Sequence, residues 1–396
     1  MQMTPALKKH FEWKGKIETK VKVPVNTEQD LALAYTPGVA DACLAIKEQP
    51  ELSYALTGRT NTVAVITDGT AILGLGNIGP EAGMPVMEGK CALFKHFGNV
   101  DAFPICLGTT DTQEIIRTVS LLQGSFGGIN LEDISAPRCF EIEQTLKKQL
   151  DIPVFHDDQH GTAIVVGAAL INALKVVKKD INDITAVVNG AGAAGTAIGK
   201  YLLRLGVNDV IMCDKTGILC KGEVYENKAH EEIALITNKH SKKGTLSDAL
   251  KGADLFVGVS VGNIVSSKMI ASMNTGAIVF ALANPIPEIS PEKAISGGAV
   301  VVGTGSSQHP NQINNALVFP GLFRGALDTR ARDINIEMMM AASKGIASVI
   351  SDDELAPDNI LPKAVDQRAH DAVAKAVAKA AIDSGVARKT DKDSVV

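Results

Sequence analysis

Two pairs of adjacent carboxylates each follow a short apolar run of this 396-residue chain. Glu132 and Asp133 follow one run, and Asp157 and Asp158 follow the other. If the runs are neighbouring parallel strands, both pairs meet at the carboxyl edge of the sheet, where α/β enzymes place their chemistry. Converging carboxylates repel one another unless a cation lies between them, and oxygen ligands suit Mg²⁺ or Mn²⁺. A divalent metal site is therefore one explanation of the spacing.

Helix capping explains the second pair equally well. Asp157 and Asp158 precede a long apolar stretch that we expect to be helical from Thr162 onward, and acidic side chains stabilise a helix N-terminus. The flanking His156 and His160 are too few for a borderline-soft metal site, so we interpret them as orienting or packing residues. The spacing alone leaves metal binding and capping open.

A glycine-rich loop in the second half of the chain predicts a dinucleotide site. The loop consists of Gly190, Ala191, Gly192, Ala193, Ala194 and Gly195. A strand is predicted before it and an amphipathic helix after it, so that the helix amides can bind a pyrophosphate. Asp214 ends the next predicted strand, where an acid can bind the adenosine ribose hydroxyls. Its carboxylate favours NAD, whereas Lys215 beside it could accommodate the 2′-phosphate of NADP.

The same glycine spacing occurs a second time, from Gly74 to Gly79, in a different context. Pro80 and an irregular run up to Gly89 are expected to follow it, whereas a dinucleotide loop needs a helix there. We interpret this copy as a tight turn beside the active site.

Strand-like and helix-like runs alternate along both halves, which predicts an α/β fold in two domains. The predicted strands are 62–67, 101–107, 128–131, 153–155, 185–188, 210–213, 255–259, 277–281 and 300–302, and the predicted helices include 112–122, 139–150, 162–178, 334–350 and 364–382. We expect residues 1–160 to form an N-terminal α/β domain for substrate and metal. Residues 161–396 would form a Rossmann-type, doubly wound parallel sheet with C-terminal helices.

Composition argues against several classes of function. The net charge is −5 without a basic cluster interleaved with aromatic residues, so a nucleic-acid partner is not expected. The N-terminus lacks the apolar stretch of a signal peptide, and Asn172 and Lys175 interrupt an apolar run that is too short to span a bilayer. Six scattered cysteines indicate small core residues in a reducing compartment. We therefore expect a cytoplasmic protein without a membrane partner.

These motifs, in this order, resemble the malic enzyme family, and in particular its shorter, bacterial-type members. The matching segments are Tyr35-Thr36-Pro37-Gly38-Val39, Thr67-Asp68-Gly69, 73–79, 84–90, 131–134, 155–163, 190–195, Asn284-Pro285, Asn314-Asn315 and 319–321. They cover most of the chain between Tyr35 and Gly321, and the segment 155–163 is highly specific. The resemblance implies oxidation and decarboxylation of malate to pyruvate and CO₂ by a homodimer, with NAD or NADP and with Mg²⁺ or Mn²⁺.

The resemblance also implies roles for single residues. Glu132, Asp133 and Asp158 would bind the metal, and Asp157 would support catalysis beside them. Lys90 would be the general base and Tyr35 the general acid. Asn284 and Asn315 would bind the substrate carboxylate, and Asn284 would also lie beside the cofactor. Without the resemblance, Lys90 would be interpreted as a solvated surface lysine. One departure concerns Ala71, where larger members carry a substrate-binding arginine, so part of the carboxylate recognition lacks a residue.

Two other functions fit parts of the same pattern. A metal-dependent 2-hydroxyacid dehydrogenase would use the same cofactor and metal residues but would release no CO₂ from malate. A non-catalytic nucleotide-sensing protein would keep the glycine loop and show no turnover, although the presence of Lys90 and Tyr35 argues against it.

Overall fold

The computed structural model describes residues 3–72 and 75–389 and contains two sheets. The first has the strand order β2-β1-β3-β4, all parallel, with β1 (Thr62–Thr67), β2 (Asp101–Cys106), β3 (Gly128–Leu131) and β4 (Val154–His156). The second has the order β10-β9-β8-β5-β6-β7, with β5 (Thr185–Asn189), β6 (Asp209–Asp214), β7 (Gly217–Ile218), β8 (Leu255–Gly258), β9 (Ala277–Ala281) and β10 (Ala299–Thr304). Only β7 pairs antiparallel among these strands. The predicted class, α/β with parallel sheets, is confirmed.

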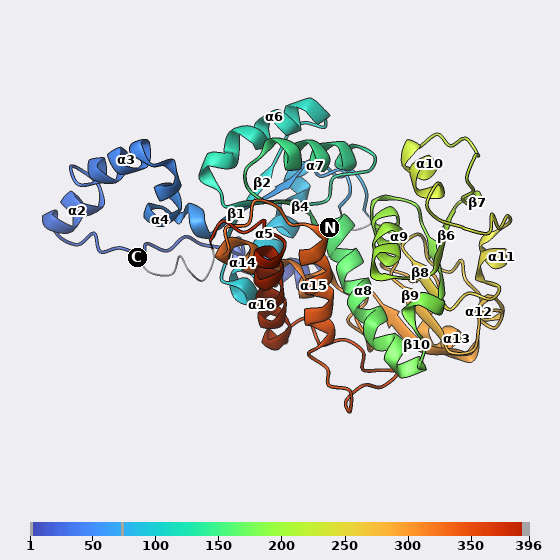
Figure 1. Ribbon diagram of the computed structural model, residues 1–396. Coiled ribbons are helices and arrows are strands. Elements are labelled where there is room, and N and C mark those ends of the chain that lie inside the picture. Colours follow the sequence, from blue (N-terminus) through green and yellow to red (C-terminus); the bar gives the residue numbers. More distant parts are fainter. Residues whose placement is uncertain (1–2, 73–74, 390–396) are drawn as a thin grey trace.

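Helices surround both sheets (Figure 1). Those of the first half are α1 (Pro5–Trp13), α2 (Glu28–Ala34), α3 (Val39–Glu48), α4 (Ser53–Leu56), α5 (Pro80–Gly98), α6 (Thr112–Leu122), α7 (Arg138–Gln149) and α8 (Asp157–Val177). Those of the second half are α9 (Ala193–Leu205), α10 (Lys228–Ala234), α11 (Leu246–Leu250), α12 (Ser267–Ile270), α13 (Pro291–Ser296), α14 (Phe319–Asp328), α15 (Ile336–Ala347) and α16 (Gln367–Asp383).

Strand β1 is buried on both faces, as expected of a parallel sheet between helix layers. Val63 and Val65 pack in one apolar cluster with α5, α8 and α14, while Ala64 and Ile66 pack in another with α6 and α7. Because both faces of the sheet are buried, the predicted strands are apolar throughout and do not alternate between apolar and polar residues.

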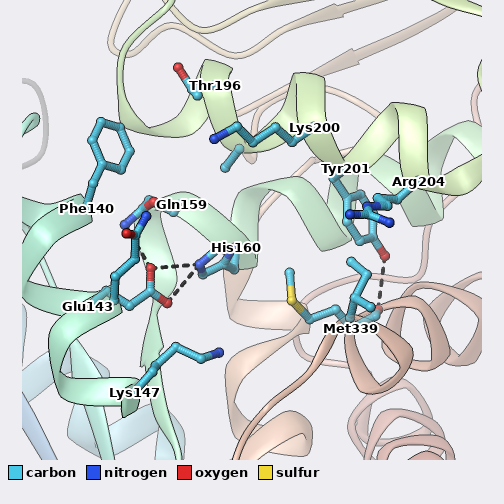
Figure 2. A pocket seen from close by; sticks show the side chains of 13 residues that line it. Phe140, Glu143, Lys147, Gln159, His160, Thr196, Lys200, Tyr201, Arg204 and Met339 are labelled. Atoms are coloured by element: carbon cyan, nitrogen blue, oxygen red, sulfur yellow. Dashed lines mark hydrogen bonds and ion pairs between the residues drawn. The ribbon is translucent and has the colours of Figure 1, made fainter. Parts of the chain in front are cut away.

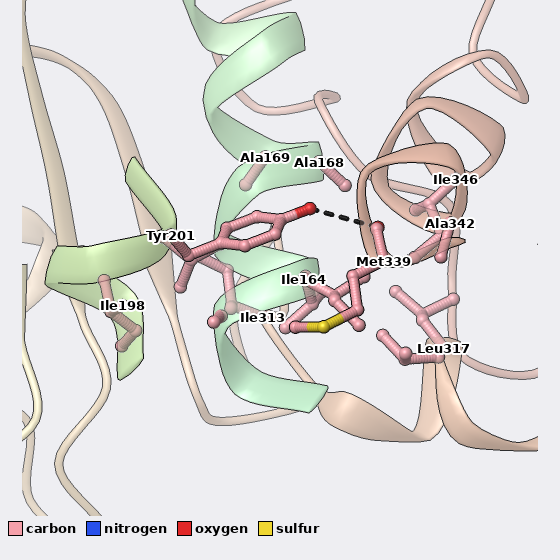
Figure 3. Close-up of a cluster of buried hydrophobic side chains, with 14 of the residues drawn as sticks. Ile164, Ala168, Ala169, Ile198, Tyr201, Ile313, Leu317, Met339, Ala342 and Ile346 are labelled. Carbon is pink, nitrogen blue, oxygen red and sulfur yellow. Dashed lines mark hydrogen bonds between the residues drawn. The ribbon is translucent and has the colours of Figure 1, made fainter. Parts of the chain in front are cut away.

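Helix α8 joins the two sheets and forms the centre of the largest apolar cluster. In Figure 3 the ring of Tyr201, from α9, lies between α8 and α15, and its hydroxyl donates a hydrogen bond to the carbonyl of Met339 at 3.0 Å. Because α8 begins at Asp157 and not at Thr162, it is 21 residues long. The expectation that its apolar run is too short for a bilayer is therefore wrong, because the helix is long and apolar enough to cross a membrane by length and composition. However, 67% of its most apolar 18-residue segment is buried inside the protein.

The structure corrects the expectation for the residues after Gly79. They form α5 and not an irregular run. Pro80 occupies the first helical turn, where the missing N–H of a proline costs nothing, and Pro85 is accommodated inside the helix. Leu73 and Gly74 lie outside the described residues, so the loop that precedes α5 is known only from Leu75 onward.

The C-terminal helices pack on two helices of the first half of the chain. Helices α14 and α16 pack on α5, and α15 packs on α8. The ring of Phe94 in α5 lies 4.7 Å from that of Phe319 and 5.3 Å from that of Phe323. These contacts place the beginning of α14 directly beside α5.

An N-terminal arm, residues 20–52, extends away from the sheets and carries α2 and α3 (Figure 1). Neither helix contains a buried residue. The large apolar side chains that the arm exposes are Val21, Val23, Val25, Leu31, Leu33, Tyr35, Val39 and Leu44. Water therefore surrounds side chains that normally pack in a core. Cys43 is exposed on the same arm, so it departs from the expectation of core cysteines; all six cysteines are free.

Candidate active site

The register of the first sheet brings the two acidic pairs to one edge. Leu131 of β3 lies opposite His156 of β4, and Ile66 of β1 lies opposite Leu131. Glu132 follows Leu131 and Asp157 follows His156, so these two acids lie side by side where their strands end. The strand order reverses between β1 and β3, which is the position where open α/β sheets bind their ligands.

Three carboxylates converge at this edge. One oxygen from each of Glu132, Asp133 and Asp158 lies within 4.8 Å of the others. Glu132 and Asp133 are buried, and the backbone N–H of Asp133 donates to Oδ2 of Asp158 at 2.8 Å. The N-cap of α8 is His156, which makes no side-chain capping bond. Asp158 therefore lies both in the first turn of α8 and in the acidic cluster. Helix stabilisation and metal binding are thus compatible explanations of its position.

Lys90 reaches the same edge from α5. Its Nζ lies 2.5 Å from Oε1 of Glu132, contacts Oδ2 of Asp157, and lies 4.4 Å from the ring centre of Phe319. The residue is only 7% exposed, so it is not a solvated surface lysine. Burial by itself lowers the pKa of Lys90, but the charges of Asp157 and Glu132 outweigh it and raise the pKa above the usual value.

The acids of the site carry more negative charge than Lys90 balances. Burial, partly offset by Lys90, raises the pKa of Glu132 and that of Asp157 to about 7. The pKa of Asp158 is raised for the same reason. Carboxylates that are destabilised by burial and by one another form a donor set that fits a hard divalent cation.

Asp157 is fixed by neighbours on both sides. Nδ2 of Asn315 donates to its Oδ2 at 2.5 Å, which brings the predicted substrate residue Asn315 into the site. A Cβ at position 161 would lie 1.9 Å from Oδ1 of Asp157, so Gly161, one helical turn later, must lack a side chain. This contact explains the glycine in the segment 155–163.

The dinucleotide loop has the geometry that its sequence predicts. Gly190 has φ +108°, and a Cβ at Gly195 would lie 1.7 Å from the carbonyl oxygen of Gly190. Helix α9 begins at Ala193, so its free amides face the carboxyl edge of the second sheet. A Cβ at Gly190 would lie 2.5 Å from the carbonyl oxygen of Val259, which follows β8, at the point where the strand order of the second sheet reverses. The loop therefore lies where a dinucleotide binds in such sheets.

Asp214 ends β6 as predicted, and a histidine that the sequence did not single out connects it to the loop. Oδ1 of Asp214 accepts hydrogen bonds from the backbone and hydroxyl of Thr216 at 2.7 and 2.6 Å. Nδ1 of His230 lies 3.7 Å from Oδ2 of Asp214, and Nε2 lies 2.9 Å from the carbonyl oxygen of Ala191. His230 was missed because its contacts cross from α10 to two distant segments.

A second residue that the sequence did not indicate is Glu288. It is fully buried and accepts hydrogen bonds from the backbone of Ser260 at 2.8 Å and of Ala283 at 3.1 Å. It thereby holds together the loops that follow β8 and β9. Asn284 is exposed in the second of these loops, on the carboxyl edge of the nucleotide sheet.

Tyr35 is the one predicted catalytic residue that does not lie in this cluster. It follows α2 on the N-terminal arm, and its side chain is 66% exposed. Figure 1 shows α2 at the end of the molecule farthest from the nucleotide sheet.

The two histidines beside the acidic pair differ in surroundings. His160 pairs with Glu143 at 2.8 Å in the wall of a cavity of about 410 Å³ between α7, α9 and α15 (Figure 2). Gln159 donates to the same Glu143 carboxylate at 3.2 Å. His156 is fully buried with Nδ1 3.9 Å from Oδ2 of Asp158, and burial lowers its pKa to about 4. Both positions agree with orienting or packing roles.

The fold and site define a class of protein, a two-sheet α/β chain with a dinucleotide loop on one sheet and a buried lysine among carboxylates on the other. Residues 14–117 match the malic enzyme N-terminal domain, and residues 159–382 match the malic enzyme NAD binding domain. The chain belongs to the malic enzyme family.

Individual relatives agree with this assignment. The chain is 57% identical over 375 residues to an NAD-dependent malic enzyme of Geobacillus stearothermophilus, covering 95% of this chain and 78% of that protein. It is 55% identical over 386 residues to a bifunctional malic/malolactic enzyme of Bacillus subtilis, covering 97% and 94%. A crystal structure of an NAD-dependent malic enzyme from Thermotoga maritima superposes with a TM-score of 0.92 at 50% identity, covering 95% and 99%.

Proposed function

We propose that this protein oxidises and decarboxylates malate to pyruvate and CO₂ while reducing NAD or NADP. The observation that carries the proposal is the contact of Lys90 with Glu132 and Asp157, beside the cluster completed by Asp133 and Asp158. A buried lysine among carboxylates is poised to exchange a proton with a substrate bound at that edge. Family membership supports the same reaction.

Glu132, Asp133 and Asp158 would hold a divalent cation, Mg²⁺ or Mn²⁺. Such a cation would acidify the 2-hydroxyl of malate and balance the negative charge that develops on its oxygen. Asp157, which contacts Lys90 and Asn315, would orient both side chains toward the substrate. Asn315 would then bind a substrate carboxylate, and Asn284 would approach from the nucleotide sheet.

Lys90 would accept the proton of the malate hydroxyl while the hydrogen on C2 leaves as hydride. The nicotinamide cofactor, when bound at the loop 190–195, supplies the acceptor for that hydride. Breaking the bond between C3 and the departing carboxylate would release CO₂ and leave the enolate of pyruvate, which needs one proton at C3, and Tyr35 would donate it. Asp214 at the ribose position favours NAD over NADP, because a carboxylate repels a 2′-phosphate.

We propose that the protein is a homodimer in which the N-terminal arm of one copy brings Tyr35 to the Lys90 site of the other. The exposed apolar side chains of the arm support this arrangement, since a second copy would remove them from water. The other three tyrosines are engaged elsewhere: Tyr201 with Met339, Tyr225 with Cys220, and Tyr54 with Arg59. Residue 35 lies in the segment that matches the malic enzyme N-terminal domain, which supports Tyr35 as the proton donor.

We also propose the division into a substrate and metal domain, 1–160, and a nucleotide domain, 161–396. The two sheets support it, and the contacts of α14 and α16 with α5 indicate that the last helices serve both domains.

The test is a malate assay with NAD and with NADP, each in excess chelator and after addition of Mn²⁺, in which CO₂, pyruvate and lactate are measured. We expect CO₂ and pyruvate in equal amounts with the metal and none without it. Reduced cofactor without CO₂ would instead identify a 2-hydroxyacid dehydrogenase, and absence of turnover would favour a nucleotide-sensing protein. Lactate is measured because the Bacillus subtilis relative is a malic/malolactic enzyme.

A further inference from the structure

Arg138, the first residue of α7, connects loops from three neighbouring strands of the first sheet. Its Nη1 donates to Oδ2 of Asp68, after β1, and to the carbonyl of Thr110, after β2, both at 2.8 Å. Its Nη2 donates to Oγ1 of Thr70 at 3.0 Å and to Oγ of Ser135, after β3, at 3.1 Å. All four terminal N–H groups of the guanidinium are therefore engaged.

The loops that Arg138 joins lead directly to the metal residues. Asp68 is buried and also accepts from the hydroxyl of Thr70 at 2.6 Å, which fixes the loop after β1. The backbone N–H of Ser135 donates to the same Thr70 hydroxyl at 3.0 Å. In turn, the N–H of Ala71 donates to the carbonyl of Asp133 at 3.0 Å. Hydrogen bonds at Thr70 and at the adjacent Ala71 thus connect Arg138 to the backbone of Asp133.

Asp133 needs such support because its backbone is strained. Its φ is +53°, in the left-handed region that residues other than glycine enter at a cost. This conformation directs the N–H of Asp133 to Asp158 and its carbonyl to Ala71, while the side chain stays in the carboxylate cluster. Strained conformations of this kind persist when the surrounding structure holds them in place.

We infer that Arg138 is a positioning residue that presets Asp133 for metal binding by joining the loops after β1, β2 and β3. Its engaged guanidinium also means that Arg138 does not replace the substrate-binding arginine missing at Ala71. The inference rests on the metal site of the proposed function and concerns the free protein before malate or nucleotide binds.

The experiment measures Mn²⁺ binding to the full-length protein by calorimetry, without malate or nucleotide, together with the melting temperature. Arg138→Met should weaken Mn²⁺ binding by about 10- to 100-fold, the usual effect of removing a group that orients metal ligands. Arg138→Lys should recover part of the affinity, because one ammonium can keep the ion pair with Asp68 but cannot span all three loops. Arg117→Met, an exposed arginine on α6, is the matched control and should bind Mn²⁺ like the wild type.

A purely structural role predicts a lower melting temperature with unchanged Mn²⁺ affinity, and that result would overturn the inference. If Arg138→Met does not fold, Thr70→Val removes the hydroxyl shared by Arg138 and Ser135, and unchanged Mn²⁺ affinity in that variant overturns the inference as well. Failure of the proposed function is distinguishable, because a wild type that binds Mn²⁺ without oxidising malate leaves the role of Arg138 intact. If the wild type binds no Mn²⁺, both the metal site of the proposed function and the role of Arg138 are wrong.

Discussion

The Nζ of Lys90 lies 2.5 Å from Oε1 of Glu132, with both side chains almost fully removed from solvent. Glu132 belongs to the acidic cluster, so the same carboxylate faces the proposed base and the proposed metal. A cation bound at the cluster must therefore lower the pKa of Lys90, because it weakens the attraction to the carboxylates that now favours the ammonium form. The metal site and the base act as one unit.

Replacing Lys90 with alanine should reduce kcat for malate oxidation by roughly 10²- to 10⁴-fold, the usual effect of losing a general base. Lys95→Ala is the matched control, since Lys95 lies on the same helix in an exposed ion pair with Asp101. Initial rates of NAD reduction at saturating malate and Mn²⁺ give the comparison. Equal rates for the two variants would rule out Lys90 as the base.

Tyr35 and Lys90 should complement each other across subunits. Tyr35→Phe should slow pyruvate formation, since the ring remains but the proton donor is lost. When this variant and Lys90→Ala are unfolded and refolded together, random pairing should restore about a quarter of the wild-type activity, because half of the dimers carry one intact site. Gel filtration checks that the mixture is dimeric. If Tyr35 acts within its own chain, mixing restores nothing.

The stabilisation by Mn²⁺ should grow as the pH rises from about 4.5 to about 7. Burial raises the folded-state pKa of Glu132 and Asp157 to about 7, so these acids stabilise the metal-free fold when protonated, and that stability is lost as the pH rises through about 7. Mn²⁺ at Glu132, Asp133 and Asp158 binds ionised Glu132 and attracts the charge of the neighbouring Asp157, so it compensates for this loss. The measurement is the melting temperature with Mn²⁺ minus that with chelator across the pH range. A difference that shrinks with rising pH would contradict the assignment.

Asp214→Ala should narrow any preference for NAD over NADP, because it removes the ribose partner and the charge that opposes a 2′-phosphate. The comparison is the ratio of kcat/KM for the two cofactors. Lys215→Ala serves as the companion variant and should shift the ratio the other way, since it removes a cation beside the same position. If Asp214→Ala leaves the ratio unchanged, another residue selects the cofactor.

Local patterns in the sequence were enough for much of the framework. The loop 190–195 could be placed between a strand and a helix because the spacing of its glycines reflects contacts within a few residues, such as that of Gly195 with Gly190. The acidic pairs could be placed at one edge because parallel strands all end there. Helix α5 was missed because Pro85, Gly83 and Gly89 inside it are local signals against a helix, although Pro80 in its first turn is compatible with one.

Contacts between residues far apart in the chain were decided by the tertiary structure alone. Lys90 meets Asp157 across 67 positions, and Arg138 meets Asp68 across 70. Neither pair leaves a periodic signal, because a side chain's partner across such a distance depends on strand order and on the packing of the intervening helices. The exposure of Tyr35 was likewise decided by the tertiary structure. The resemblance to the malic enzyme family implies that Tyr35 is an acid, but only the fold places it on an arm away from Lys90, since local sequence determines α2 and not where α2 points.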